Sequence, residues 1–99
     1  MNELVKKVEE WAKDRELHIA DPHKQMLKVV EEVGEISGAL ARNNIGDLEV
    51  EIGDGIVTLI ILSMQLGMDI EKCLELAYKK IEKRSGKTVN GIYIKKEDL

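Results

Sequence analysis

Residues 28–35 of the chain read KVVEEVGE, and this stretch decides how one helix divides into a polar and an apolar face. At 3.6 residues per turn, one face carries four charged side chains: Lys28, Glu31, Glu32 and Glu35. That face cannot form an apolar core seam. The remaining circumference can, because apolar residues recur there at helical spacing; they are Met26, Leu27, Val29, Val30, Val33, Ile36 and Leu40. We expect this helix to pack through its apolar face and to carry chemistry on its acidic face.

A second acidic pair, Glu51 and Asp54, stands one helical turn apart and directly before the apolar run of residues 56–66. Like charges one turn apart destabilise a helix, and two such pairs at one helix interface cost more unless something neutralises them. A divalent cation is the natural candidate. Oxygen ligands without a nearby histidine or cysteine suit Mg²⁺, or Mn²⁺ in its place, better than zinc.

The three glutamates of residues 31–35 and the pair Glu51 and Asp54 together form the pattern Glu-Glu-x-x-Glu, fifteen residues, Glu-x-x-Asp. This pattern resembles the signature of the all-α nucleoside triphosphate pyrophosphohydrolases of the MazG-like type. The surroundings are also similar to the short, single-domain phage and bacterial members: WAKDR at residues 11–15, KR at 83–84 and GKTVNG at 86–91. The resemblance covers nearly the whole chain.

The resemblance implies a Mg²⁺-dependent hydrolase that converts a nucleoside or deoxynucleoside triphosphate into the monophosphate and pyrophosphate. The scarcity of aromatic residues fits a broad, nucleotide-pool house-cleaning activity as a hypothesis. It implies four metal ligands: Glu32, Glu35, Glu51 and Asp54. Glu31 is left for an auxiliary role, either as a further ligand or as the group that orients and deprotonates the attacking water. The catalytic carboxylates are therefore expected among Glu31, Glu32 and Glu35.

Cations must hold the triphosphate beyond the metal. Lys28 lies one turn before Glu31, and Lys83 with Arg84 ends the last predicted helix, where a basic pair also suits the helix dipole. The family uses a Lys-Arg pair near this point, which favours phosphate contact. Trp11 is either a core anchor or a ring that stacks on the base, and Asn90 is a weaker candidate for sugar or phosphate.

The fold expected is all-α, a bundle of four helices in a single domain of residues 1–99. The helices are predicted near residues 2–16, 22–42, 44–66 and 70–83, with Asp21 and Asp69 as N-caps. The tail of residues 88–94 could form a hairpin around an Asn-Gly turn. Because the third helix is apolar nearly all round, we expect a homodimer or homotetramer that covers it.

Composition excludes several function classes. A net charge of −4 and a pI near 5.2 argue against binding to nucleic acid polymers, which needs a basic surface. One cysteine, Cys73, allows no internal disulfide. The start lacks a signal-peptide pattern, and the apolar run of residues 56–66 is shorter than the roughly 20 residues that a membrane span needs. The expected location is the cytoplasm.

Other interpretations remain open. The acidic face could be a solvated surface, and a di-iron bundle would need Glu-x-x-His pairs that neither histidine supplies. A helical oligomer could keep the fold and sense nucleotides or bind a protein without turnover, or cleave a different pyrophosphate. The base is also open, because the chain has no Phe, one Trp and two Tyr.

Overall fold

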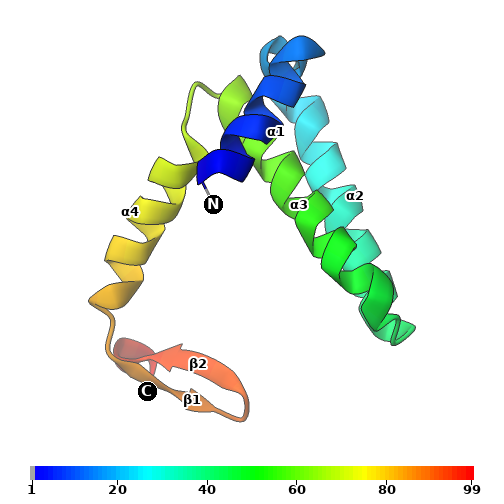
Figure 1. The fold of residues 1–99 in the computed structure, drawn as a ribbon. Coiled ribbons are helices and arrows are strands. Elements are labelled where there is room, and N and C mark those ends of the chain that lie inside the picture. Colours follow the sequence, from blue (N-terminus) through cyan, green and yellow to red (C-terminus); the bar gives the residue numbers. More distant parts are fainter. Residues whose placement is uncertain (1) are drawn as a thin grey trace.

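The computed structural model describes residues 2–99, with side chains from residue 3 onward. Four α-helices precede a β-hairpin (Figure 1). Their bounds are α1 Asn2–Asp14, α2 Pro22–Ala41, α3 Ile45–Gln65, α4 Ile70–Glu82, β1 Gly86–Val89 and β2 Ile92–Lys95, with short 3-10 turns at Leu17–Ile19 and Lys96–Asp98. The prediction of a four-helix, mostly helical fold with a C-terminal hairpin is confirmed.

Helices α2 and α4 both begin with an aspartate N-cap. The Oδ1 atom of Asp21 accepts a hydrogen bond of 2.9 Å from the backbone N–H of His23, and Pro22 follows at the first position of α2. Asp69 caps α4 in the same way, accepting from the N–H of Glu71 at 2.9 Å. Both predicted N-caps are therefore confirmed.

The hairpin is an antiparallel pair in which Val89 faces Ile92 and Gly86 faces Lys95. Its turn places Asn90 at φ 52° and Gly91 at φ 80°. Two successive residues with positive φ match the twist of the flanking strands, and Asn-Gly is the dipeptide that adopts this turn most readily. Asn90 thus has a structural reason to be where it is.

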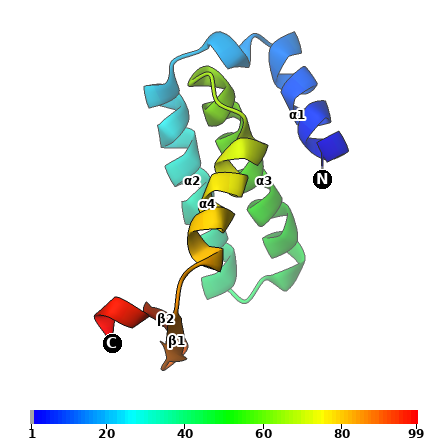
Figure 2. The same cartoon turned by 90° about the vertical axis from the view of Figure 1, so that its left-hand side faces the viewer.

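The core lies where α1 and α2 pack on α3 (Figures 1 and 2). Each of these three helices supplies buried side chains: Val5, Ala12, Val29, Ala39, Ile60, Ile61 and Ser63. Ser63 satisfies its hydroxyl by donating to the carbonyl oxygen of Ile60 at 2.7 Å. The described residues of α4 and of the hairpin contribute no buried side chain.

The packing face of α2 differs from the prediction. Only Val29 and Ile36 of the predicted apolar face are turned into the structure, whereas five of its members are 45–71% exposed: Met26, Leu27, Val30, Val33 and Leu40. The reason is that α3 packs beside the acidic face. Ile36 lies over Gly55, where a Cβ would be 3.4 Å from its Cδ1, so a glycine helps the two helices to approach closely. Within a single chain, α2 therefore packs through only part of its predicted apolar face.

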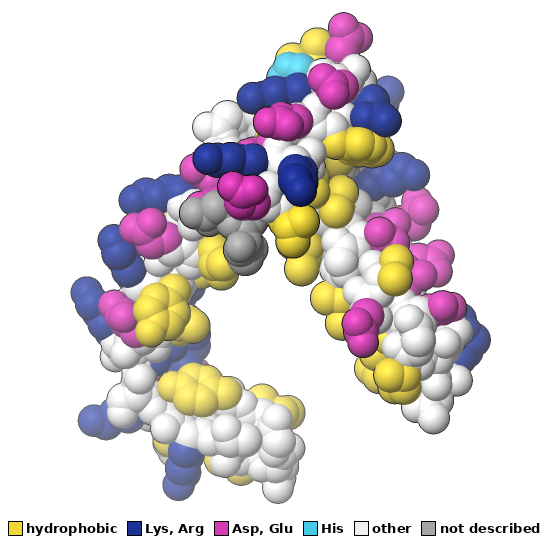
Figure 3. All heavy atoms as spheres, viewed as in Figure 1, with side chains coloured by type: hydrophobic (Ala, Val, Ile, Leu, Met, Phe, Trp, Pro, Cys, Tyr) yellow, Lys and Arg dark blue, Asp and Glu magenta, His cyan; other side chains and the backbone are white. Residues whose placement is uncertain are grey.

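The chain is not compact. Helices α3 and α4 meet at a bend of 104°, and α4 with the hairpin extends away from the other helices (Figure 1). The radius of gyration is 16.1 Å, whereas about 13 Å is typical of a compact domain of this length. Hydrophobic side chains gather on the concave side enclosed by this bend (Figure 3). Of the helices described, none alone is long and apolar enough to cross a membrane, although α3 and α4 together pass that test as a bent pair.

Candidate metal centre

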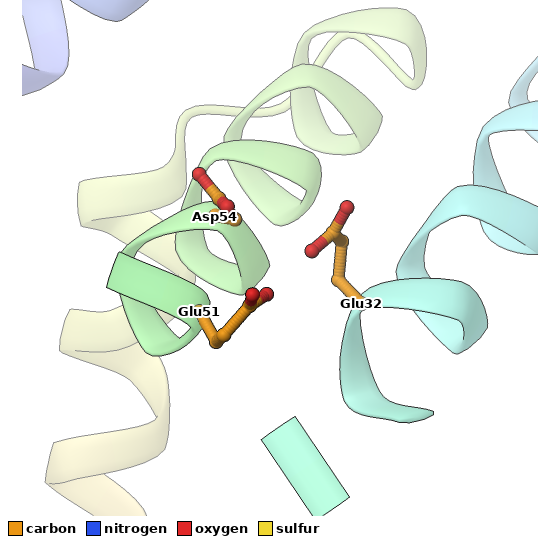
Figure 4. Close-up of side chains that lie close together, drawn as sticks. All are labelled: Glu32, Glu51 and Asp54. Atoms are coloured by element: carbon orange, nitrogen blue, oxygen red, sulfur yellow. The ribbon is translucent and has the colours of Figure 1, made fainter. Parts of the chain in front are cut away.

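Three carboxylates from two helices meet at the interface of α2 and α3. Oxygen atoms of Glu32, Glu51 and Asp54 all lie within 4.8 Å of one another. Figure 4 shows Glu32 reaching across from α2 toward the two acidic residues of α3. The cluster exists because one helical turn separates Glu51 from Asp54, while the packing of α2 on α3 brings Glu32 opposite them. Three of the four predicted metal ligands are thus brought together.

The electrostatics of this cluster favour a bound cation. Partial burial, followed by the neighbouring carboxylates of Glu35, Asp54 and Glu32, raises the pKa of Glu51 above its ordinary value. None of the ion pairs found among the described residues involves Glu32, Glu51 or Asp54. A hard divalent cation with oxygen ligands fits this donor set, because it relieves the repulsion that the carboxylates otherwise share.

The two remaining predicted carboxylates lie at the edge of the cluster. Glu35 is close enough to Glu51 to raise its pKa but stands outside the group whose oxygens approach within 4.8 Å. Glu31 is exposed, and its Oε2 atom lies 3.7 Å from the Nζ atom of Lys28. The structure therefore separates an inner triad from two outer carboxylates on the same helix.

A cavity of about 390 Å³ opens beside the triad. The residues that line it include Glu32, Asp54, Lys28 and Trp11. Trp11 is 45% exposed, with the guanidinium of Arg15 lying 4.3 Å from its ring centre, so it is a cavity wall and not a core anchor. One cavity is therefore lined by an aromatic residue, a basic residue and two of the clustered acidic residues.

Gln25 also lines this cavity, and the sequence analysis missed it. Its Nε2 atom donates a hydrogen bond of 3.0 Å to the carbonyl oxygen of Thr58, which fixes the amide between α2 and α3. Helical spacing could have identified Gln25, because it stands seven residues before Glu32 and therefore on the same helical face. Its fixed amide can contribute to recognition of whatever enters the cavity.

The predicted phosphate-binding residues of the C-terminal part lie elsewhere. Lys83 is the C-cap of α4, Arg84 follows it, and Asn90 occupies the hairpin turn. None of them lines the cavity beside the triad. Figure 1 shows that α4 leads away from the middle of α3, where Asp54 lies. Within one chain, the predicted phosphate-binding residues are therefore divided, because Lys28 lies beside the triad and the others lie at the end of α4 and in the hairpin.

The comparison with known families matches residues 20–89 to the MazG nucleotide pyrophosphohydrolase domain. The chain belongs to this family. The MazG match spans both acidic pairs, α4 and the first strand of the hairpin, whereas α1 with Trp11 precedes it. The resemblance that the acidic pattern predicted is therefore confirmed.

One protein similar to this chain comes from a phage. The chain is 37% identical over 70 residues to a protein of Haemophilus phage HP1 (strain HP1c1), described as an uncharacterized 18.2 kDa protein in the rep-hol intergenic region. The matched region covers 70% of this chain and 43% of that protein, so the chain spans less than half of the relative's length. The search of solved structures returned no match.

Proposed function

We propose that this protein is a Mg²⁺-dependent nucleoside triphosphate pyrophosphohydrolase, with Mn²⁺ as a possible substitute. The observation that carries the proposal is the meeting of Glu32, Glu51 and Asp54 in a chain of the MazG family. When bound there, Mg²⁺ would offset the charge that develops on the phosphoryl group and polarise the attacking water. The triad supplies three ligands, and we assign Glu35, whose charge acts on Glu51, as the fourth.

The reaction consumes one water and one triphosphate. The water oxygen bonds to the α-phosphorus while the bond from that phosphorus to the α–β bridging oxygen breaks, and pyrophosphate leaves with the bridging oxygen. A carboxylate must take the proton of the water. We assign this role to Glu31, the carboxylate left outside the ligand set, and a positioned base contributes about 10²–10⁴-fold.

The cavity supplies the contacts to the substrate. We assign the phosphate contact to Lys28, one turn before Glu32, and the base contact to Trp11, whose aromatic ring is a surface on which a base can stack. Because the chain offers one tryptophan and no phenylalanine, the base is held by few aromatic contacts. We therefore propose broad selectivity among bases, as a house-cleaning role requires, in a homo-oligomer that covers the exposed apolar residues of α3.

The test is to measure monophosphate and pyrophosphate together from a panel of ribo- and deoxynucleoside triphosphates, with Mg²⁺, with Mn²⁺ and with EDTA. Equal amounts of both products, formed only with metal, are the expected result. Hydrolysis of only those triphosphates that carry one particular base would overturn broad selectivity. If the protein binds metal but hydrolyses no nucleotide of the panel, the proposal of an enzyme is overturned and a nucleotide sensor is favoured.

A further inference from the structure

The chain contains two glutamines, and both join separate elements through the same kind of hydrogen bond. The Nε2 atom of Gln25 donates to the carbonyl oxygen of Thr58 at 3.0 Å, and the Nε2 atom of Gln65 donates to the carbonyl oxygen of Leu17 at 2.9 Å. Each amide is therefore fixed with its nitrogen toward a backbone carbonyl. The two glutamines differ in what surrounds the amide oxygen.

The amide oxygen of Gln65 is buried and has no hydrogen-bond partner among the described residues. The oxygen of Gln25 also accepts no hydrogen bond within the described part of the chain, but it is not one of the buried unpaired atoms there, so solvent reaches it. Gln25, unlike Gln65, lines the cavity beside the triad. Because an amide nitrogen carries two hydrogens, Gln25 keeps both an acceptor and a second donor for a ligand.

The cavity has two chemically different ends. Gln25 stands seven residues before Glu32 on α2, and Ile61 stands seven residues after Asp54 on α3. Both separations amount to about 10 Å along a helix at 1.5 Å per residue. The bond from Gln25 to Thr58 shows that these two stretches face each other. One end of the cavity therefore has the carboxylates, and the other end is lined by Leu17, Gln25, Thr58 and Ile61.

At this second end, the amide of Gln25 is the polar group that a ligand can use. Leu17 and Ile61 are apolar, and the hydroxyl of Thr58 already donates to the carbonyl oxygen of Gly55 at 2.7 Å. Binding sites for small molecules combine apolar walls with a few polar groups that fix the orientation of the ligand. The volume of about 390 Å³ lies in the range of roughly 300–1,000 Å³ found for such sites.

We propose that Gln25 is a specificity-determining residue, which reads the hydrogen-bonding edge of the base at the end of the cavity opposite the triad. This inference rests on the proposed function, because phosphates at the carboxylate end leave the other end for the base. A glutamine amide pairs with a donor and an acceptor that lie side by side, as N6 and N7 of adenine do. Every canonical base carries a donor next to an acceptor on its Watson–Crick edge. The contact therefore selects an intact base edge without selecting a single base.

The first experiment removes one group from the ligand and needs no variant. AMP is compared with purine riboside monophosphate, and CMP with zebularine monophosphate, because each analogue lacks only the exocyclic amino group. Trp11, the only tryptophan, lines the same cavity, so its fluorescence reports binding. We expect each analogue to bind roughly 10–100-fold more weakly, since the amide of Gln25 then lacks a partner. The corresponding triphosphates should show the same ratio in kcat/KM.

The second experiment removes the amide from the protein. Gln25→Met keeps the length of the side chain but has neither its donor nor its acceptor. We expect this variant to bind AMP and its analogue equally, to raise KM for ATP more than it lowers kcat, and to bind inorganic pyrophosphate with Mg²⁺ as the unmodified protein does in calorimetry. Gln65→Met is the matched control, because it breaks the same kind of backbone bond outside the cavity and should keep the preference for AMP.

Equal binding of AMP and its analogue to the unmodified protein would overturn the role of Gln25. A folded Gln25→Met variant that keeps the preference, or that loses pyrophosphate binding as strongly as AMP binding, would show that Gln25 only joins α2 to α3. Hydrolysis without the preference would leave the proposed function standing and overturn the base contact. The preference without hydrolysis of any triphosphate would overturn the proposed function and support the contact.

Discussion

Residues 1–69, the body, and residues 70–99, the arm, both contain regular helices but gain their stability differently. The body packs α1 and α2 on α3 and buries residues such as Ile60 and Val29. The arm has capped, regular elements of its own, yet none of its described side chains is buried. Local signals alone are therefore enough to shape the arm, although a single chain gives it no buried side chains of its own among the described residues.

The same comparison separates the chemistry of the two parts. The body holds the three clustered carboxylates, Lys28 and Trp11, and the arm holds the basic pair and the Asn-Gly turn. Within one chain, the carboxylate cluster and Lys28 therefore lie in one part of the molecule, and Lys83 with Arg84 lies in the other. Four predictions test how far the two parts differ.

The largest effect is expected in the body, at the metal centre. Asp54→Asn keeps the shape of the side chain but removes a charge from the triad, and we expect hydrolysis to fall at least ~100-fold, since even changes behind a metal's direct ligands cost 10–100-fold. Glu49→Gln is the matched control, because Glu49 is an exposed acidic residue of the same helix outside the triad. Equal rates for both variants would show that the triad is not the metal site.

The next effect distinguishes the core of the body from the surface of the arm. Ile60 is 2% exposed, so Ile60→Ala should lower the free energy of unfolding by about 2–5 kcal/mol. Ile92→Ala, in the hairpin, removes the same atoms from a side chain that is 67% exposed. This change should alter the free energy of unfolding by less than about 0.5 kcal/mol. Chemical denaturation at a fixed protein concentration measures both. Similar losses would mean that the hairpin is packed as firmly as the core.

A smaller effect tests the helix that joins the two parts. Asp69→Ala removes the oxygen that accepts from the N–H of Glu71, and the loss of such an N-cap costs about 1 kcal/mol. Asp69→Asn keeps an acceptor oxygen and serves as the control. Thermal unfolding followed by circular dichroism should place the alanine variant below both the control and the unmodified protein. An unchanged transition would show that the start of α4 is held by other contacts.

The smallest effect concerns charge repulsion in the metal-free body. Because partial burial and neighbouring carboxylates raise the pKa of Glu51, the ionised side chain destabilises the fold above its ordinary pKa of 4.5. In EDTA at neutral pH, Glu51→Gln should therefore melt slightly higher than the unmodified protein, and the difference should vanish as the pH falls below 4.5, where Glu51 is protonated in both states. With Mg²⁺ present the order should reverse, since a ligand has been lost. The same gain from Glu49→Gln would show that net charge, not the triad, is responsible.

Local signals in the sequence determined the elements well. Asp-Pro at residues 21–22 and Asp69 marked two helix starts, and Asn90-Gly91 marked the hairpin turn, because caps and turns depend on a few neighbouring backbone groups. The sequence also predicted the family correctly, since the spacing of four carboxylates on two helices is a property of the sequence alone.

Only the tertiary structure decided which surfaces meet. Helical spacing assigned Val30 and Val33 to the core because they are apolar, but α3 packs beside the acidic face and leaves them exposed. Spacing also could not tell that Glu35 stands outside the triad or that Lys83 and Arg84 lie far from it, since both depend on the angle at which helices cross and bend. Periodicity fixes which residues share a face of a helix, and the packing of one helix on another decides what that face touches.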